Sequence, residues 1–166
     1  MTRTGLVGLG IMGSALSGHL LARGFPVVGY DLSAQRVQEL AAAGGTAARS
    51  VEEVATSADV VITSLPSADA AVDVCTALAA QAAARLVVVE TSTLPHSTKD
   101  RCRQLLAEAG AELLDCPLSG TGAQALERDV VVYGSGDETA FESARPVMEA
   151  FSRSVRYLGT FGRGRR

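Results

Sequence analysis

Several short segments of the chain are almost entirely Val, Ile and Leu, with no alternation of apolar and polar residues. Clear examples are residues 86–90 and 130–134. Uninterrupted apolar runs of this length are typical of strands that are covered on both faces, as in parallel sheets. Longer, Ala-rich amphipathic stretches separate these runs, and that alternation predicts right-handed strand–helix–strand crossovers. We therefore expect an α/β fold with a doubly wound, mostly parallel sheet and helices on both faces.

The boundaries follow from the same pattern and from local stop signals such as Gly24 with Pro26. Strands are expected over residues 4–9, 26–30, 59–64, 86–90, 111–115, 130–134 and 154–158. Helices are expected over residues 11–23, 33–43, 51–57, 68–84, 95–109, 119–127 and 138–151.

Composition narrows the class of protein. At 166 residues the chain is long enough for one domain with its own core, and its net charge of −3 argues against a nucleic-acid-binding protein. Three dispersed cysteines favour reduced thiols in a cytoplasm, and their spacing predicts no metal site. No apolar stretch is long enough for a membrane span, and no signal peptide precedes the first strand. We therefore expect a cytoplasmic protein with neither membrane nor nucleic-acid partners.

The strongest local motif is glycine-rich and lies between the first expected strand and the first expected helix. It reads Gly8, Leu9, Gly10, Ile11, Met12, Gly13. In this context Gly8 permits a tight turn, Gly10 lets the backbone approach a pyrophosphate, and Gly13 lets helix and strand pack closely. The helix amides and dipole then face the negative charge. These features predict a Rossmann-type dinucleotide site, the alternative being a purely structural turn.

Asp31 bears on which dinucleotide is bound. It ends the second expected strand, 18 residues after Gly13. A carboxylate there accepts hydrogen bonds from the adenosine ribose and repels a 2′-phosphate, which favours NAD over NADP. Arg36 lies nearby and could soften that exclusion. The alternative role for Asp31 is a charge or cap at the start of the helix near Ser33.

With these residues in view, the chain resembles the N-terminal domain of the β-hydroxyacid dehydrogenase family, which includes 3-hydroxyisobutyrate dehydrogenase and tartronate semialdehyde reductase. Four segments carry the resemblance, in family order: residues 8–13, 63–67, 90–93 and 115–120. The resemblance implies that Leu65 and Pro66 pass under the cofactor and that Thr93 lies beside the nicotinamide. It also implies that Ser119, Gly120 and Thr121 bind a small carboxylate-bearing substrate.

The residues themselves permit simpler roles. Pro66 could be an ordinary strand-ending proline, and Thr93 could cap the helix that follows Pro95. Ser119 and Gly120 are expected to open a helix, where a hydroxyl and free amides suit either a carboxylate or a cap.

The chain departs from the family pattern at the end of the fourth of these segments. Thr121 stands where the family has a second glycine, with Gly122 as a possible compensation, and Arg128 replaces a later glycine. These changes alter the expected shape of the substrate pocket, so the motif by itself does not name one substrate. Cys116, beside the motif, is expected to replace a small apolar residue.

The resemblance also locates the proton-transfer residue. In the family a Gly-x-Gly turn, matched here by Gly162 and Gly164, precedes a helix that bears the catalytic lysine. That lysine would follow Arg166, so no catalytic residue is expected within the chain. The chain's single lysine, Lys99, is expected to be a solvated charge on a helix face. His19 is expected on a helix face, and His96 is the nearest substitute proton donor.

Two functions remain open from the sequence. In the first, residues 1–160 are the NAD-binding domain of an oxidoreductase that moves a hydride between the cofactor and a small 3-hydroxy acid or semialdehyde. Residues 161–166 then begin a link to a helical domain, and the intact protein is expected to form a homo-oligomer. In the second, the chain is a dinucleotide-binding module without turnover.

Overall fold

The computed structural model describes residues 1–83 and 85–163. Its main element is a parallel sheet of six strands in the order β3-β2-β1-β4-β5-β6. The strands are β1 (Thr4–Val7), β2 (Val27–Tyr30), β3 (Thr46–Ala47), β4 (Val60–Thr63), β5 (Val87–Glu90) and β6 (Glu112–Asp115). The strand order reverses at β1, so the carboxyl ends of β1 and β4 flank the place where α/β sheets bind ligands. The doubly wound Rossmann-type fold is thus confirmed.

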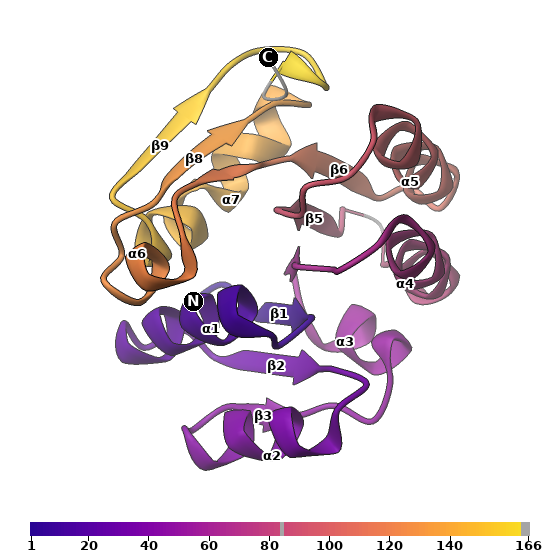
Figure 1. Cartoon of the computed structure of the whole chain (residues 1–166). Helices are drawn as coiled ribbons and strands as arrows, with labels where there is room; N and C mark the ends of the chain where they lie inside the picture. Colours follow the sequence, from indigo (N-terminus) through magenta and orange to yellow (C-terminus); the bar gives the residue numbers. More distant parts are fainter. Residues whose placement is uncertain (84, 164–166) are drawn as a thin grey trace.

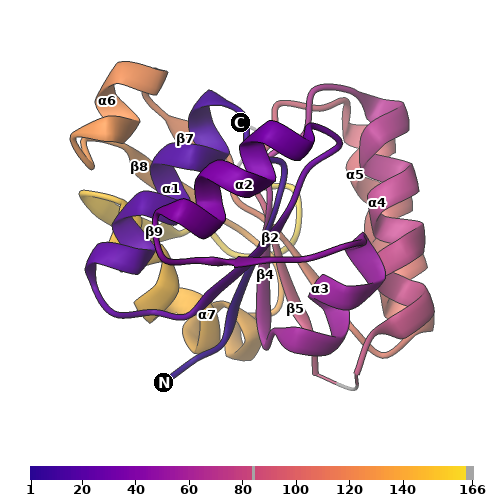
Figure 2. The same ribbon diagram turned by 90° about the horizontal axis from the view of Figure 1, so that it is seen from below.

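Helices cover both faces of this sheet, as Figures 1 and 2 show. One face carries α1 (Ile11–Ala22), α2 (Ala34–Ala42) and α7 (Glu138–Phe151), and the other carries α3 (Val51–Ser57), α4 (Ala68–Gln81) and α5 (His96–Glu108). The N-caps of α2, α3 and α4 are Ser33, Ser50 and Ser67, each of which accepts a backbone amide hydrogen bond. None of the helices in the described part of the chain is long and apolar enough to cross a membrane.

A second, three-stranded sheet lies beside the carboxyl end of β6. It consists of β7 (Leu118–Ser119), β8 (Val131–Gly134) and β9 (Ser154–Tyr157), with β7 antiparallel to β8 and β9 parallel to it. The short helix α6 (Gly122–Leu126) connects β7 to β8 and packs against α1. Helix α7 packs against both sheets and thereby joins them.

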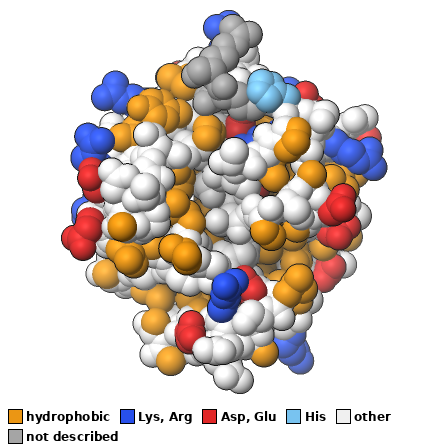
Figure 3. Space-filling view, viewed as in Figure 1, with side chains coloured by type: hydrophobic (Ala, Val, Ile, Leu, Met, Phe, Trp, Pro, Cys, Tyr) orange, Lys and Arg blue, Asp and Glu red, His pale blue; other side chains and the backbone are white. Residues whose placement is uncertain are grey.

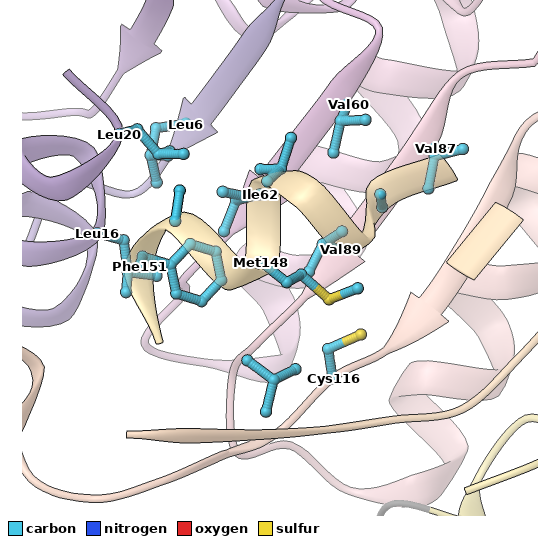
Figure 4. Close-up of a cluster of buried hydrophobic side chains, with 14 of the residues drawn as sticks. Leu6, Leu16, Leu20, Val60, Ile62, Val87, Val89, Cys116, Met148 and Phe151 are labelled. Atoms are coloured by element: carbon cyan, nitrogen blue, oxygen red, sulfur yellow. The ribbon is translucent and has the colours of Figure 1, made fainter. Parts of the chain in front are cut away.

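Two apolar cores hold these layers together, one on each face of the large sheet. On the first face, Met148 and Phe151 of α7 meet Ile62 and Val89 of the sheet and Leu16 of α1 (Figure 4). On the second face α3, α4 and α5 pack on β4, β5 and β6. The three cysteines are free and buried within these cores, in agreement with the expected reduced thiols.

The structure corrects the expected boundaries in three places. The two-residue strand β3 was not expected, because two exposed residues give no apolar run. The helix expected over 119–127 begins only at Gly122, since Ser119 pairs with Val131 in a strand. Helix α4 ends at Gln81, and Ala84, the expected last residue of that helix, lies outside the described residues.

We predict that Gly134→Ala destabilises the fold. A Cβ there would lie 2.1 Å from Cε2 of the buried Phe141 ring, so the ring must shift, which costs about 1–3 kcal/mol. Gly18→Ala is the matched control, since a Cβ at this exposed position in α1 meets nothing within 4 Å and alanine favours the helix by about 0.5–1 kcal/mol. Urea unfolding measures both, and equal effects would contradict the packing argument.

Candidate functional site

The turn between β1 and α1 requires glycine at two of its three glycine positions. Gly8 has φ +97°, and a Cβ there would lie 2.0 Å from the Ser64 carbonyl oxygen. A Cβ on Gly13 would lie 1.9 Å from the Gly8 carbonyl oxygen. Gly10 is different. The nearest atom to a Cβ placed on Gly10 would be Nη1 of Arg36, at 3.8 Å, which is ordinary van der Waals contact. The chain's own packing therefore explains Gly8 and Gly13, and leaves the space above Gly10 open to a ligand.

The amino end of α1 faces this open space. Gly10 is its N-cap and provides no side-chain hydrogen bond to the first-turn amides. Ile11, the first residue of the helix, is 76% exposed, whereas Leu9 is buried in the core. Such uncapped amides together with the helix dipole suit a phosphate or another small anion.

Asp31 ties the turn to the end of β2. Its Oδ2 accepts a hydrogen bond from the Leu9 amide at 2.7 Å, and its Oδ1 accepts one from the Ser33 amide at 2.8 Å. Ser33, not Asp31, is the N-cap of α2, so Asp31 does not cap that helix, although its charge lies at the start of the helix, as the alternative role proposed. The guanidinium of Arg36 lies 4.0 Å from Asp31 Oδ2 and partly balances its charge.

These residues line a cleft of about 1020 Å³ at the carboxyl edge of β1, β2 and β4. Of the expected cofactor residues, the cleft is lined by Gly8, Gly10, Ile11, Met12, Asp31, Leu65 and Pro66. Its other lining residues are Val7, Tyr30, Leu32, Ser33, Arg36, Ser50, Val51, Glu52, Ser64, Ala70, Asp73 and Val74. The expected residues that do not line it are Leu9, Gly13, Thr93, Ser119, Gly120 and Thr121.

Sequence reasoning missed the wall that α4 provides. Ala70, Asp73 and Val74 line the cleft, and their spacing of three and four residues marks a single face of a helix that follows Pro66. That spacing was a usable signal. Most charged side chains on the face seen in Figure 1 lie around its rim, although a basic and an acidic side chain lie together within its lower half (Figure 3). Among the residues that the structure describes, Arg36 is the single basic residue in the lining of the cleft, so backbone amides together with Arg36 are the groups that could receive an anion there.

The loops after β4 and β5 are bonded to one another. The Leu65 amide donates to the Ser92 hydroxyl at 2.7 Å, and the Thr91 hydroxyl donates to the Thr63 carbonyl at 2.8 Å. Thr93 lies in the loop between β5 and α5, and its side chain is exposed. The N-cap of α5 is Pro95. Thr93 is therefore not the cap of that helix, and the capping alternative is wrong. His96 is exposed in the first turn of α5 and is not among the residues that line the cleft.

The segment expected to bind substrate adopts a conformation that accommodates its departures from the family pattern. Gly120 has φ +142° and its Cβ would lie 2.8 Å from Val130 Cγ1, so glycine is required there. Thr121 has an extended backbone, φ −92°, and forms a capping box with Gln124. A branched residue is therefore tolerated at this position.

Arg128 stands where the family resemblance implies a glycine, and it differs from Thr121 in keeping a backbone conformation that favours glycine. It adopts φ +58°, a left-handed conformation that favours glycine. Its Nη2 donates hydrogen bonds to the carbonyls of Glu149 and Ser152, at 3.1 and 3.0 Å. These bonds satisfy carbonyls at the end of α7 and offset the backbone strain.

The segment expected to bind substrate and helix α6 after it lie against α1 and the glycine-rich turn. His19 Nε2 lies 2.7 Å from the Ala125 carbonyl, which confirms His19 as a residue on the face of α1 and fixes α6 against that helix. A Cβ on Gly122 would lie 2.6 Å from Ile11 Cγ2. Ile11 thus forms a wall shared by the cleft and the segment at residues 119–122.

A buried charged group lies beneath the loops after β5 and β6. Lys99 is only 2% exposed, and its Nζ is 2.6 Å from Oδ1 of Asp115, which is fully buried. The expectation of a solvated Lys99 is therefore wrong. The sequence held only a partial signal, because Lys99, Cys102 and Leu106 lie on one helical stripe, where a lysine can be either buried or solvated.

Glu90 and Cys116 lie near this pair. The Glu90 carboxylate accepts hydrogen bonds from the Thr63 hydroxyl and the Ser92 amide. Burial raises the pKa of Glu90 above its usual range, while these hydrogen bonds and the charge of Lys99 oppose the rise. Burial also raises the pKa of the Cys116 thiol, so that Cys116 is an unreactive core residue, as expected.

We predict that Gly122→Ala weakens dinucleotide binding because the new methyl group displaces Ile11 toward the cleft. Binding should recover in the double variant with Ile11→Ala, in which the clash is absent. Isothermal titration with NAD measures this coupling. If Gly122→Ala and Ile11→Ala weaken NAD binding additively, Gly122→Ala does not act through displacement of Ile11.

Comparison with known proteins agrees with this geometry. Residues 3–159 match the family described as the NAD binding domain of 6-phosphogluconate dehydrogenase. The NAD-dependent L-serine dehydrogenase of Pseudomonas aeruginosa is 34% identical over 99% of this chain and 56% of its own length. The mitochondrial 3-hydroxyisobutyrate dehydrogenase of Mus musculus is 30% identical over 98% of this chain and 50% of its own length.

Structural comparison gives the same relationship. The structure of Mycobacterium tuberculosis 3-hydroxyisobutyrate dehydrogenase with L-serine matches with a TM-score of 0.94 and 31% identity, over 99% of this chain and 56% of that one. The chain thus spans about half the length of the relatives it matches. It belongs to the family of NAD binding domains represented by that of 6-phosphogluconate dehydrogenase, as found in dehydrogenases of the β-hydroxyacid type.

Proposed function

We propose that the cleft receives the adenosine and diphosphate half of NAD, with the diphosphate against the amino end of α1. The observation that carries this proposal is the open space above Gly10, where the chain's own packing does not require glycine. The uncapped amides of α1 face that space, and Asp31 lies beside it in the same cleft. Gly8, Ile11 and Met12 complete this side of the cofactor site.

We place the nicotinamide beyond Leu65 and Pro66, beside Thr93. The support is that β4 and β5 are neighbours in the sheet and that the Leu65 amide is bonded to Ser92, the residue before Thr93. The substrate carboxylate would then meet Ser119, Gly120 and Thr121, which Ile11 and Gly122 bring close to the glycine-rich turn. Gly13 and Leu9 act on the site indirectly, through the packing of the turn.

The reaction we infer is hydride transfer between the nicotinamide and the carbinol carbon of a small 3-hydroxy acid or semialdehyde. Two relatives are named for L-serine and 3-hydroxyisobutyrate, which are both short carboxylic acids with a hydroxyl on the β-carbon. In this arrangement the chain's own residues bind and orient both partners, while a separate group must exchange the hydroxyl proton.

For that proton we propose a lysine beyond Arg166, as the family resemblance implies. Lys99 is buried in an ion pair with Asp115 and is therefore not available for the role. Gly162 of the matching turn is within the described residues, whereas Gly164 and the two residues after it are not. We accordingly assign the cofactor and substrate site to residues 1–160 and a link to a helical, homo-oligomer-forming domain to residues 161–166.

We expect Asp31→Ala to weaken NAD binding by about 10- to 100-fold, the cost of losing hydrogen bonds to a charged group. NADP should lose much less, because the carboxylate that repels its 2′-phosphate is also removed. Titration of both nucleotides measures the ratio. Asp69→Asn removes an exposed carboxylate outside the cleft lining and serves as the control. Equal losses for NAD and NADP would refute the ribose assignment.

The assignment of the proton donor has its own test. A polypeptide of residues 1–166 should bind NAD and show negligible oxidation of L-serine or 3-hydroxyisobutyrate, whereas a longer chain that carries the lysine should be active. NADH absorbance follows the reaction. Turnover by residues 1–166 that His96→Ala abolishes would identify His96 as the donor. Binding without turnover in the longer chain as well would favour a dinucleotide-binding module.

A further inference from the structure

The buried pair of Lys99 and Asp115 is difficult to explain as a device for stability. Transfer of two charges from water into a protein interior costs several kcal/mol per ion, and a well-packed apolar pair often serves as well. Lys99 is nevertheless 2% exposed and Asp115 is fully buried, with 2.6 Å between Nζ and Oδ1. What the pair does provide is a fixed geometry, because each buried charge must stay at hydrogen-bond distance from its partner to offset the cost of leaving water.

The pair joins two loops at the carboxyl edge of the large sheet. Lys99 is the fourth residue of α5, and its amide donates to the Pro95 carbonyl at the end of the loop that contains Thr93. Asp115 is the last residue of β6 and directly precedes the segment that leads to Ser119. The salt bridge therefore sets the distance between the proposed nicotinamide loop and the proposed substrate segment.

Glu90 is paired with Asp115 in the register of β5 and β6, and it anchors a third loop. Its carboxylate, 1% exposed, accepts hydrogen bonds from the Thr63 hydroxyl and the Ser92 amide. The Ser92 hydroxyl in turn accepts the Leu65 amide at 2.7 Å. The loops after β4, β5 and β6 are thus all anchored to side chains of a single buried cluster.

A fourth segment is anchored at the same place. Asp115 and Ser135 exchange backbone hydrogen bonds, at 3.0 and 2.9 Å, and the Ser135 hydroxyl accepts the Gly162 amide at 3.0 Å. Phe161, the preceding residue, lies under the guanidinium of Arg103 from α5, 4.9 Å from Cζ to the ring centroid. The path of the chain toward residue 163 is therefore fixed against the same cluster.

We propose that Lys99, Asp115 and Glu90 are positioning residues that hold the nicotinamide and substrate half of the site in register, independently of the adenosine half. This inference rests on the placement of the nicotinamide beside Thr93 proposed above. Asp31, Gly10 and Arg36, on the β1–β2 side, belong to the adenosine half, and their bonds do not pass through the cluster. Loss of the cluster should therefore weaken contacts to the nicotinamide and spare contacts to the rest of the nucleotide.

The test compares NADH with ADP-ribose, which lacks only the nicotinamide. The double variant Lys99→Met with Asp115→Asn removes both charges at similar volume, so the fold is expected to persist. Its Kd for NADH should rise about tenfold, while its Kd for ADP-ribose should stay within about twofold. Because the sequence contains no Trp, NADH fluorescence reports the nicotinamide environment directly, and its enhancement on binding should fall in the variant.

Leu106→Ala is the matched control, since it removes a fully buried side chain from the same helix, farther from the loops. It should lower the melting temperature and leave the ratio of the two Kd values unchanged. The proposal fails if the double variant keeps the wild-type ratio, or if Leu106→Ala changes that ratio equally. Equal affinity of the unmodified chain for NADH and ADP-ribose would instead overturn the nicotinamide placement itself, and with it this inference.

A milder variant covers the case in which the double variant does not fold. Glu90→Gln retains the shape of the side chain and replaces one carboxyl oxygen with an NH2 group, which cannot accept one of the two hydrogen bonds from Thr63 and Ser92. Amide hydrogen exchange should become faster over residues 91–95 and 116–120 and stay unchanged over residues 8–16. Unchanged exchange in both loops would contradict a positioning role for the cluster.

Discussion

The site depends above all on backbone contacts in the glycine-rich turn that leave no room for a side chain. Gly8 lies against the Ser64 carbonyl and Gly13 lies against the Gly8 carbonyl, so β1, β4 and the start of α1 meet at one place. Asp31 then accepts the Leu9 amide and adds the end of β2. The cleft opens where these ends converge, and its other walls are assembled around that point.

The two halves of the carboxyl edge are built on different physical principles. On the β1–β2 side, close backbone packing leaves amides and one carboxylate facing the cleft, and these amides are the groups that we propose receive the diphosphate in a chain of net charge −3. On the β5–β6 side, buried charges and hydroxyls bind the loops together in an environment of low dielectric. The β1–β2 half is thus shaped by close backbone packing, and the β5–β6 half by the salt bridge between Lys99 and Asp115.

The segment that we propose binds substrate, and the loop after it, accommodate their departures from the glycine pattern that the family resemblance implies. Thr121 replaces a glycine at a position with an ordinary extended backbone, where its hydroxyl caps α6. Arg128 replaces a glycine that a left-handed backbone would favour, and its guanidinium bonds to carbonyls at the end of α7. Glycine remains at position 120, where Val130 leaves no space, and at position 122, which adjoins Ile11.

The sequence by itself determined the parallel sheet, most helix positions and the glycine-rich turn, because strand burial, helix periodicity and turn geometry are set by neighbouring residues. It did not reveal the two-residue strand β3, the pairing of Ser119 in a second sheet, or the wall from α4. Above all, it did not reveal the burial of Lys99. A lysine on a helical stripe can be solvated or buried, and only the folded chain brought Asp115 within 2.6 Å of its Nζ. Such a pairing is decided in three dimensions, since its partners lie on different elements and meet only after the sheet has formed.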